Sequence, residues 1–221
     1  NLPVLQPTNL KDPEFIEELK ALNANLQIVV AFRMLPEVVW KMPEYGTFNL
    51  HASLLPDYRG AAPINWAIIK GEKETGVTTF FIDDKIDTGA IISNQETLIS
   101  PLENVETLYD RLMKMGAELS LETVNSIATG TVPTTVQKDH TDLKEAPKLD
   151  SKNTLIDFTK SAVAVDALIR GLYPYPVAKA SLYNKEQMVV KIHKSKVVEK
   201  QHKMTPGSFV IENGEMFVAC G

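Results

Sequence analysis

The chain has 221 residues, a net charge of −5 and a single cysteine, Cys220. One cysteine excludes an intrachain disulfide and a cysteine-based metal site, and a reducing cytoplasm is the setting we expect. No apolar run reaches the roughly 20 residues that a membrane-spanning helix needs, and an acidic chain has no overall attraction for nucleic acid. We therefore expect neither a membrane protein nor a uniformly basic binding protein.

The first 130 residues alternate between predicted helices and apolar strands. One helix begins at Asp12-Pro13, because Asp caps a first turn well and proline is favoured at its first position. A second runs from Pro63 to Lys70. Between them lie apolar runs rich in β-branched residues, which suit strands buried on both faces. The predicted strands cover residues 26–32, 46–50, 76–82 and 90–99. This order predicts an α/β domain with a mostly parallel sheet.

The second half of the chain changes character twice. Ser100 and Glu103 form a capping box, which predicts a long helix after them. Residues 131–153 are polar and aperiodic and predict a linker. Residues 154–172 predict another helix, and short alternating strands with turn signals follow it. The predicted domains are 1–130, the linker 131–153 and a small barrel-like β module at 154–221.

Polar side chains follow three of the predicted strands. Asn49 and His51 stand two apart, and the segments 33–36 and 83–89 follow two other strands. Ligands of open α/β sheets bind beyond the carboxyl ends of the strands, so we expect these segments to meet at one edge. Asn and His can both donate to an oxygen that gains negative charge, and Asp87 is the best candidate to orient His51. Residues two apart on a strand share a face, although such a pair alone is a weak signal.

Five short motifs together resemble the formyltetrahydrofolate-dependent formyltransferases. They are Asn-x-His at 49–51, Ser-Leu-Leu-Pro at 53–56, Arg-Gly-x-x-Pro at 59–63, Thr-Gly-Val-Thr at 75–78 and Asp-Thr-Gly at 87–89. The resemblance extends over essentially the whole chain and is strongest to the branch that acts on charged initiator tRNA. It implies a Rossmann-like catalytic domain followed by an OB-like barrel that helps to hold the tRNA.

The resemblance also implies a reaction and a set of site residues. The formyl group of 10-formyltetrahydrofolate would pass to the α-amino group of methionine on the charged tRNA, without a metal. Asn49, His51 and Asp87 would be catalytic. The implied folate contacts are Ser53, Leu54, Leu55, Pro56, Arg33, Met34, Leu35, Asp83 and Asp84. We expect a cytoplasmic monomer. The family's first strands would precede Asn1 and its closing strands would follow Gly221, so we expect both ends to be incomplete.

A basic segment stands out in the acidic chain. Residues 177–203 contain seven lysines against two glutamates, which suggests an anionic partner; the alternative is a solvated lysine face. These lysines are Lys179, Lys185, Lys191, Lys194, Lys196, Lys200 and Lys203.

Three other functions stay open from the sequence. A sugar-nucleotide N-formyltransferase and a formyltetrahydrofolate hydrolase would share the Asn-x-His and Asp-Thr-Gly motifs. A non-catalytic nucleic-acid-binding protein, with the β module as an OB-like binder, belongs to a different class. The lysine-rich module favours the tRNA enzyme, and the scarcity of aromatic residues in that module argues against the non-catalytic binder.

Overall fold

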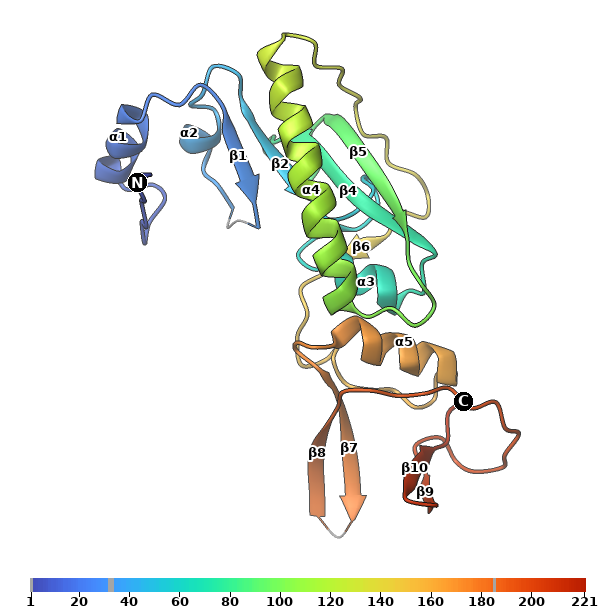
Figure 1. Cartoon of the computed structure of the whole chain (residues 1–221). Coiled ribbons are helices and arrows are strands. Elements are labelled where there is room, and N and C mark those ends of the chain that lie inside the picture. The colour runs from blue at the N-terminus through green and yellow to red at the C-terminus, as the bar shows by residue number, and fades with distance from the viewer. Residues whose placement is uncertain (1, 32–33, 185) are drawn as a thin grey trace. The chain divides into compact units, whose positions relative to one another are not determined.

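The structure, a computed structural model, describes residues 2–31, 34–184 and 186–221 (Figure 1). The chain divides into two compact units that interleave along the sequence. The first unit comprises Asn1–Arg59, Gly76–Glu96 and Met113–Lys144, and the second comprises Gly60–Thr75, Thr97–Leu112 and Glu145–Gly221. Each unit is described by itself below. The predicted domain boundaries at residues 130 and 154 stay predictions.

The largest sheet has four strands in the order β1-β2-β4-β5. Its strands are β1 (Gln27–Val30), β2 (Thr47–His51), β4 (Glu74–Phe81) and β5 (Ile91–Leu98). The helices in the same part of the sequence are α1 (Pro13–Ala21), α2 (Glu37–Trp40) and α4 (Val105–Ala128). All four predicted strands are therefore confirmed, as is the helix start at Asp12, whose carboxylate accepts the Glu14 N–H at 3.0 Å.

The sheet is mixed, whereas the sequence predicted a mostly parallel one. Strands β1 and β2 are parallel, but β2 and β4 are antiparallel, with Phe48 opposite Phe81 and His51 opposite Thr78. The carboxyl end of β4 consequently lies beside the start of β2. The end of β4 therefore does not by itself bring residues 83–89 to His51.

The two faces of β2 have different roles because successive side chains alternate. Phe48 is fully buried in a cluster with Ile92 of β5 and Ile127 of α4. Leu50, on the same side, is close to Gly116, where an added Cβ would lie 2.6 Å from the Leu50 Cδ2. Gly116 thus lets α4 approach this face closely. Asn49 and His51 belong to the other face.

The second unit packs two helices around an apolar cluster. It contains α3 (Pro63–Ile69), α5 (Ala162–Leu172), β6 (Glu145–Ala146), β7 (Ala178–Asn184), β8 (Glu186–Ile192), β9 (Phe209–Glu212) and β10 (Glu215–Val218). The two-residue strand β3 (Arg59–Gly60) pairs with β6. Helix α3 packs against α5, and the buried cluster joins Leu172, Ile169 and Ala178.

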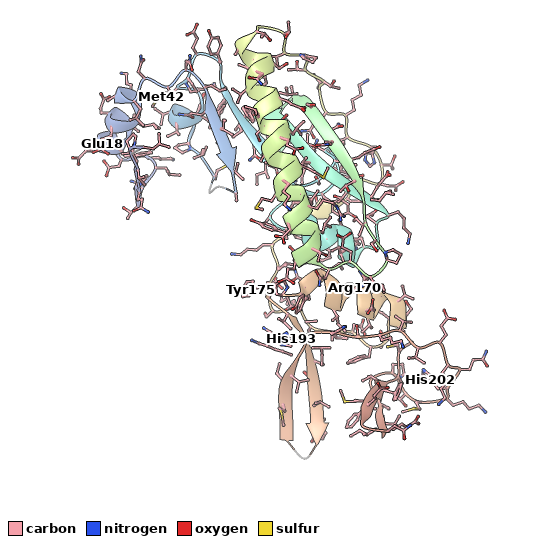
Figure 2. All side chains as sticks on the ribbon, in the orientation of Figure 1. Glu18, Met42, Arg170, Tyr175, His193 and His202 are labelled. Atoms are coloured by element: carbon pink, nitrogen blue, oxygen red, sulfur yellow. The ribbon has the colours of Figure 1, made fainter. Side chains whose placement is uncertain are left out.

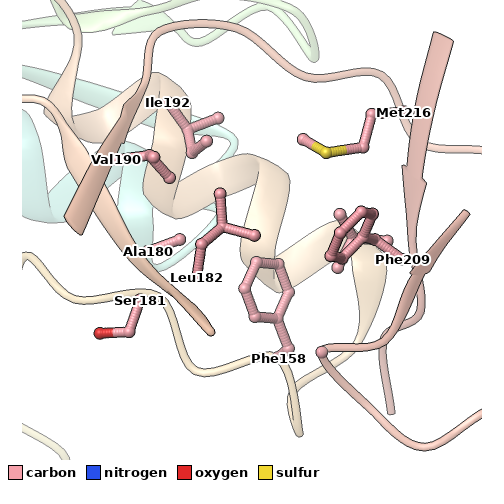
Figure 3. Close-up of a pocket in the computed structure, with 10 residues that line it drawn as sticks. Phe158, Ala180, Ser181, Leu182, Val190, Ile192, Phe209 and Met216 are labelled. Atoms are coloured by element: carbon pink, nitrogen blue, oxygen red, sulfur yellow. The ribbon is translucent and has the colours of Figure 1, made fainter. Parts of the chain in front are cut away.

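The β module consists of two separate antiparallel hairpins, β7–β8 and β9–β10. The prediction of a small β module is confirmed, but within the described residues the strands form no closed barrel. Asn213 and Gly214 both have positive φ, 53° and 81°, as the predicted two-residue turn requires. The hairpins line a small apolar cavity with Phe158, Leu182 and Phe209 among its walls (Figure 3).

Two predicted helices begin later than their sequence patterns indicated. Helix α4 begins at Val105, where the Asn104 side chain accepts the N–H three residues on at 3.1 Å. Helix α5 begins at Ala162, and the Ser161 hydroxyl caps it at 3.3 Å. Polar side chains before these starts bond to nearby backbone and stabilise turns instead of a helix.

A network of charged groups ties α5 to the turn before α4. Arg111 makes a bidentate pair with Glu103 at 2.7 and 2.8 Å, and Arg170 (Figure 2) donates to the Glu103 carbonyl and to Asp166, both at 2.7 Å. Burial alone would raise the pKa of the Glu103 carboxyl, but hydrogen bonds from Arg111 and the Ser100 N–H outweigh it and hold that pKa below its ordinary value. This stabilisation is present at neutral pH and is lost as the pH falls through the lowered pKa.

No helix within the described residues is both long and apolar enough to cross a membrane. Arg33 and Lys185, two residues of predicted function, lie outside the described part of the chain.

We predict that Gly171→Ala destabilises the fold although alanine favours helices. A Cβ there would lie 2.4 Å from Ile69 Cγ1 and 3.1 Å from the Asn65 carbonyl oxygen. Overpacking typically costs about 1–3 kcal/mol, against a gain of about 1 kcal/mol in helix propensity. Chemical denaturation should show a lower free energy of unfolding, with Val163→Ala on the exposed side of α5 as the control. Equal or higher stability of Gly171→Ala would show that α3 and α5 are not in close contact.

Candidate active site

The His51 ring is buried and faces an oxygen at each of its nitrogens. Its Nε2 lies 2.8 Å from the Tyr58 carbonyl oxygen. Because a carbonyl can only accept, Nε2 carries a proton and donates it. Its Nδ1 lies 3.8 Å from Asp87 Oδ2, and the two side chains are only 7% and 8% exposed. The Nδ1 atom thus faces a carboxylate oxygen at a distance longer than a hydrogen bond.

Asp87 reaches His51 through the fold of its loop rather than through the end of β4. The Ile82 N–H donates to the Thr47 carbonyl, and the Phe81 N–H donates to the Ala90 carbonyl, so the loop closes on itself. A Cβ on Gly89 would lie 1.7 Å from the Phe81 carbonyl oxygen. Only glycine fits this approach of the two chain segments, which gives the Asp-Thr-Gly motif a steric reason.

Asp83 fixes the same loop from within. Its carboxylate accepts the Thr88 hydroxyl at 2.8 and 3.0 Å and the Lys85 N–H at 3.0 Å. Asp83 was predicted as a folate contact. Its carboxylate accepts these hydrogen bonds from Thr88 and Lys85 within the loop. Asp84 beside it is exposed.

The two residues that face the His51 nitrogens both have left-handed backbone. Tyr58 has φ of 61° and Asp87 has φ of 55°. Non-glycine residues in this region are strained by about 1–3 kcal/mol, and such strain concentrates at functional sites because the surroundings hold it there. Contacts with the rest of the protein must therefore hold Tyr58 and Asp87 in this backbone conformation.

Asn49 lies two residues before His51 on the same face of β2 and is only 3% exposed. Within the described residues, its side-chain amide has no hydrogen-bond partner. Because it is not among the fully buried unsatisfied groups of the described residues, the amide keeps some contact with solvent.

The Ser-Leu-Leu-Pro turn is built around Thr78. The Thr78 hydroxyl donates to the Ser53 carbonyl at 2.6 Å and accepts the Leu55 N–H at 3.3 Å. The Ser53 hydroxyl in turn donates to the Asp57 carbonyl at 2.7 Å. Ser53 and Leu55 are buried inside the turn, while Leu54 and Pro56 are half-buried at its surface.

The remaining predicted folate contacts follow β1. Met34 is 63% exposed, Leu35 is half-buried, and Arg33 is outside the described residues. Among the described residues, no group of three or more His, Cys, Asp or Glu side chains is placed to hold a metal ion.

Two family models match this chain. Residues 2–124 match the model described as formyl transferase, and residues 148–221 match its C-terminal domain. The first match alone covers more than half of the chain.

The chain belongs to the formyl transferase family.

The resemblance predicted from the five motifs is thereby confirmed. The methionyl-tRNA formyltransferase of Flavobacterium johnsoniae is 58% identical over 220 residues, which are 99% of this chain and 70% of that protein. Among solved structures, HypX from Aquifex aeolicus in complex with tetrahydrofolic acid has a TM-score of 0.70 at 21% identity, covering 95% of this chain and 36% of that one. At this identity the likeness shows the fold alone.

A second solved structure is similar to this formyl transferase. The N-formyltransferase from Helicobacter canadensis, in complex with folinic acid and dTDP-3-aminofucose, has a TM-score of 0.62 at 25% identity. It covers 78% of this chain and 62% of that one.

The sequence did not reveal the residues of this formyl transferase that surround its His51–Asp87 pair. Tyr58 lies between two of the motifs and was given no role, and residues 131–153 were predicted to be a linker. That segment is ordered: Thr135 and Ile91 exchange backbone hydrogen bonds at 2.8 and 2.9 Å. A signal was present in the sequence at Arg59, because a guanidinium can only donate and therefore needs an acceptor elsewhere in the chain.

We predict that Thr78→Val destabilises this formyl transferase although valine has nearly the same shape. The change leaves the buried Ser53 carbonyl and Leu55 N–H without the Thr78 hydroxyl. Leaving buried polar groups unsatisfied costs about 1–3 kcal/mol, and the destabilisation should appear in chemical denaturation. Thr134→Val, at an exposed position outside the helices and strands, is the matched control. If Thr78→Val unfolds at the same denaturant concentration as the wild type, the hydroxyl does not organise the turn.

Proposed function

We propose that this formyl transferase moves the formyl group of 10-formyltetrahydrofolate to the α-amino group of methionine on charged initiator tRNA. The observation that carries the proposal is 58% identity over 99% of the chain to a protein named methionyl-tRNA formyltransferase. The folinic acid in the Helicobacter canadensis structure supports a folate donor. We further propose that the protein acts as a monomer in the cytoplasm.

The proposed reaction needs donors at the formyl oxygen and a path for one proton. The neutral amine attacks the formyl carbon, the bond from that carbon to N10 breaks, and the proton that leaves the amine is matched by one that N10 takes up. The intermediate carries negative charge on the formyl oxygen. We assign the Asn49 amide and protonated His51 as the donors to this oxygen, and removing one such donor typically costs about 10²–10³ in rate.

The geometry supports a division of labour between the two nitrogens of His51. Nε2 is engaged with the Tyr58 carbonyl, which leaves Nδ1 to serve the substrate. The 3.8 Å between Nδ1 and Asp87 exceeds a hydrogen-bond length. We propose that the carboxylate acts on His51 mainly through its charge, and that it accepts the amine proton and passes it toward N10.

The folate site is proposed to use the outer side of the Ser-Leu-Leu-Pro turn. Leu54 and Pro56 have accessible surface for packing on the folate, whereas Ser53 and Leu55 shape the turn from inside. Backbone groups of the segments 33–35 and 82–86 complete the proposed site.

The lysines of the β module are proposed to hold the tRNA backbone. Lys179 and Lys191 stand directly opposite each other in β7 and β8. Like charges opposite each other destabilise a hairpin, and an anionic partner relieves that repulsion. Lys194 and Lys196 follow in the same segment and are exposed, as is His193 (Figure 2). RNA helices are held largely through their backbone, so lysines suffice without base readout.

A direct assay tests the proposal against its rivals. The full-length protein is given 10-formyltetrahydrofolate with charged initiator tRNA, charged elongator tRNA, an amino-sugar nucleotide or no acceptor. The proposal expects transfer to charged initiator tRNA above all others. Transfer to the sugar would assign the sugar enzyme, formate release without acceptor would assign a hydrolase, and tRNA binding without chemistry would assign the non-catalytic binder.

We predict that Asp87→Asn lowers kcat by about 10²–10⁴-fold, the usual contribution of a positioned acid–base group. The amide keeps the size of the side chain, so the affinity for folate should hardly change. It removes the charge that supports protonated His51, so the chemical step should become slower. Steady-state kinetics with both substrates provides the measurement, and Asp142→Asn at an exposed position provides the control. Near wild-type turnover at neutral pH would make Asp87 merely structural.

We predict that replacing Lys191, Lys194 and Lys196 by Gln raises the KM for charged tRNA and leaves that for 10-formyltetrahydrofolate unchanged. Removing a lysine that binds a phosphate should also reduce the slope of log affinity against log salt by about one. The matched control replaces Lys11, Lys20 and Lys114, which are equally exposed, and removes the same amount of charge. An unchanged salt slope would leave the lysines of the β module as a solvated face.

A further inference from the structure

The segment after α4 contacts both residues that face His51. Residues 135–144, called the strap here, bond to the chain around Asp87 at one end and to the chain around Tyr58 at the other. At the second end, the Tyr58 N–H donates to the Lys144 carbonyl at 2.6 Å, and the Lys144 N–H donates to the Asp57 carboxylate at 3.0 Å. The strap therefore reaches both partners of the imidazole.

The first end of the strap depends on one side chain, that of Gln137. Its Nε2 donates to the Asp87 carbonyl at 2.9 Å and to the Gly89 carbonyl at 2.8 Å. Its Oε1 accepts from Arg59 Nε at 3.1 Å and from Arg59 Nη2 at 2.7 Å. Arg59 also pairs with Asp139 at 2.9 Å. All four hydrogen-bonding positions of the amide are thus in use.

The chemistry of these contacts requires a carboxamide at position 137. Two carbonyl oxygens on the loop can only accept, so they need two N–H donors, and the guanidinium of Arg59 can only donate, so it needs an acceptor. Glutamine supplies both from one planar group. A carboxylate would keep Arg59 but turn an oxygen toward the two carbonyls.

We infer that Gln137 is a positioning residue, which sets the distance of the Asp87 carboxylate from His51 by holding the backbone on both sides of Thr88. The inference rests on the proposed function, in which Asp87 supports protonated His51. The left-handed backbone of Asp87 is strained on its own, so contacts outside the loop must hold it. Gln137 provides two of them.

Two variants separate positioning from general stability. Gln137→Glu keeps the acceptor for Arg59 and removes both donors to the loop, whereas Gln137→Ala removes everything. Lys138→Ala, at the exposed neighbouring position, is the control. The experiment measures kcat and KM for both substrates, the melting temperature, and amide hydrogen exchange in residues 83–89, all in the full-length protein.

We expect Gln137→Glu to lower kcat by on the order of 10²-fold or less, as a small misplacement of a catalytic group does. Its KM values should stay near those of the wild type, its melting temperature should fall no further than that of Gln137→Ala, and exchange in residues 83–89 should become faster. Gln137→Ala should show the same faster exchange together with a lower melting temperature. Lys138→Ala should match the wild type in every measurement.

The contrary results are distinct. Wild-type kcat and wild-type exchange in Gln137→Glu would overturn the inference, and so would a lower kcat without faster exchange, because Gln137 would then act elsewhere. If the wild-type protein transfers no formyl group to any acceptor, the proposed function fails instead. The exchange measurement then still decides whether Gln137 holds the loop.

Discussion

The imidazole of His51 is held between a backbone carbonyl and a carboxylate, and the arrangement of the first unit follows from keeping those two oxygens in place. The Tyr58 carbonyl at 2.8 Å fixes which nitrogen carries the proton, and Asp87 lies 3.8 Å from the other. Both oxygen-bearing residues have strained left-handed backbone, so neither would stay there without support. The closed loop after β4, the turn built on Thr78 and the ordered strap all contribute that support.

The sequence predicted that Asn49, His51 and Asp87 lie near one another, but Asp87 approaches His51 by a different route from the one predicted. The Asn49 and His51 pair follows from the alternation of a strand, which is a local property of the chain. Asp87 was placed beside them on the assumption of parallel strand ends, yet β4 runs antiparallel to β2. The loop still reaches His51, because the Phe81 carbonyl can approach Gly89 closely and the Asp83 carboxylate accepts a hydrogen bond from the Thr88 hydroxyl. These are contacts between chain segments, which hydrophobic periodicity does not reveal.

The features that the sequence did not predict also depend on contacts that hydrophobic periodicity does not reveal. The strap lies within the predicted linker, which stays a prediction, and polar aperiodic sequence does not reveal side chain–backbone bonds such as those of Gln137 to residues 50 and 48 positions earlier. The start of α5 at Ala162 was missed because turns fixed by Asp150 and Asp157 compete with a helix before it. The two hairpins were predicted as strands from alternation, but alternation does not say whether strands close into a barrel.

The tautomer of His51 tests this account most directly. Nitrogen-15 NMR of the imidazole in the full-length protein, followed as the pH is varied, reports which ring nitrogen keeps its proton in the neutral form. The account predicts that Nε2 keeps it, because the Tyr58 carbonyl accepts from that atom. A neutral form protonated at Nδ1 would contradict it, since Nε2 would then have no proton to donate to Tyr58.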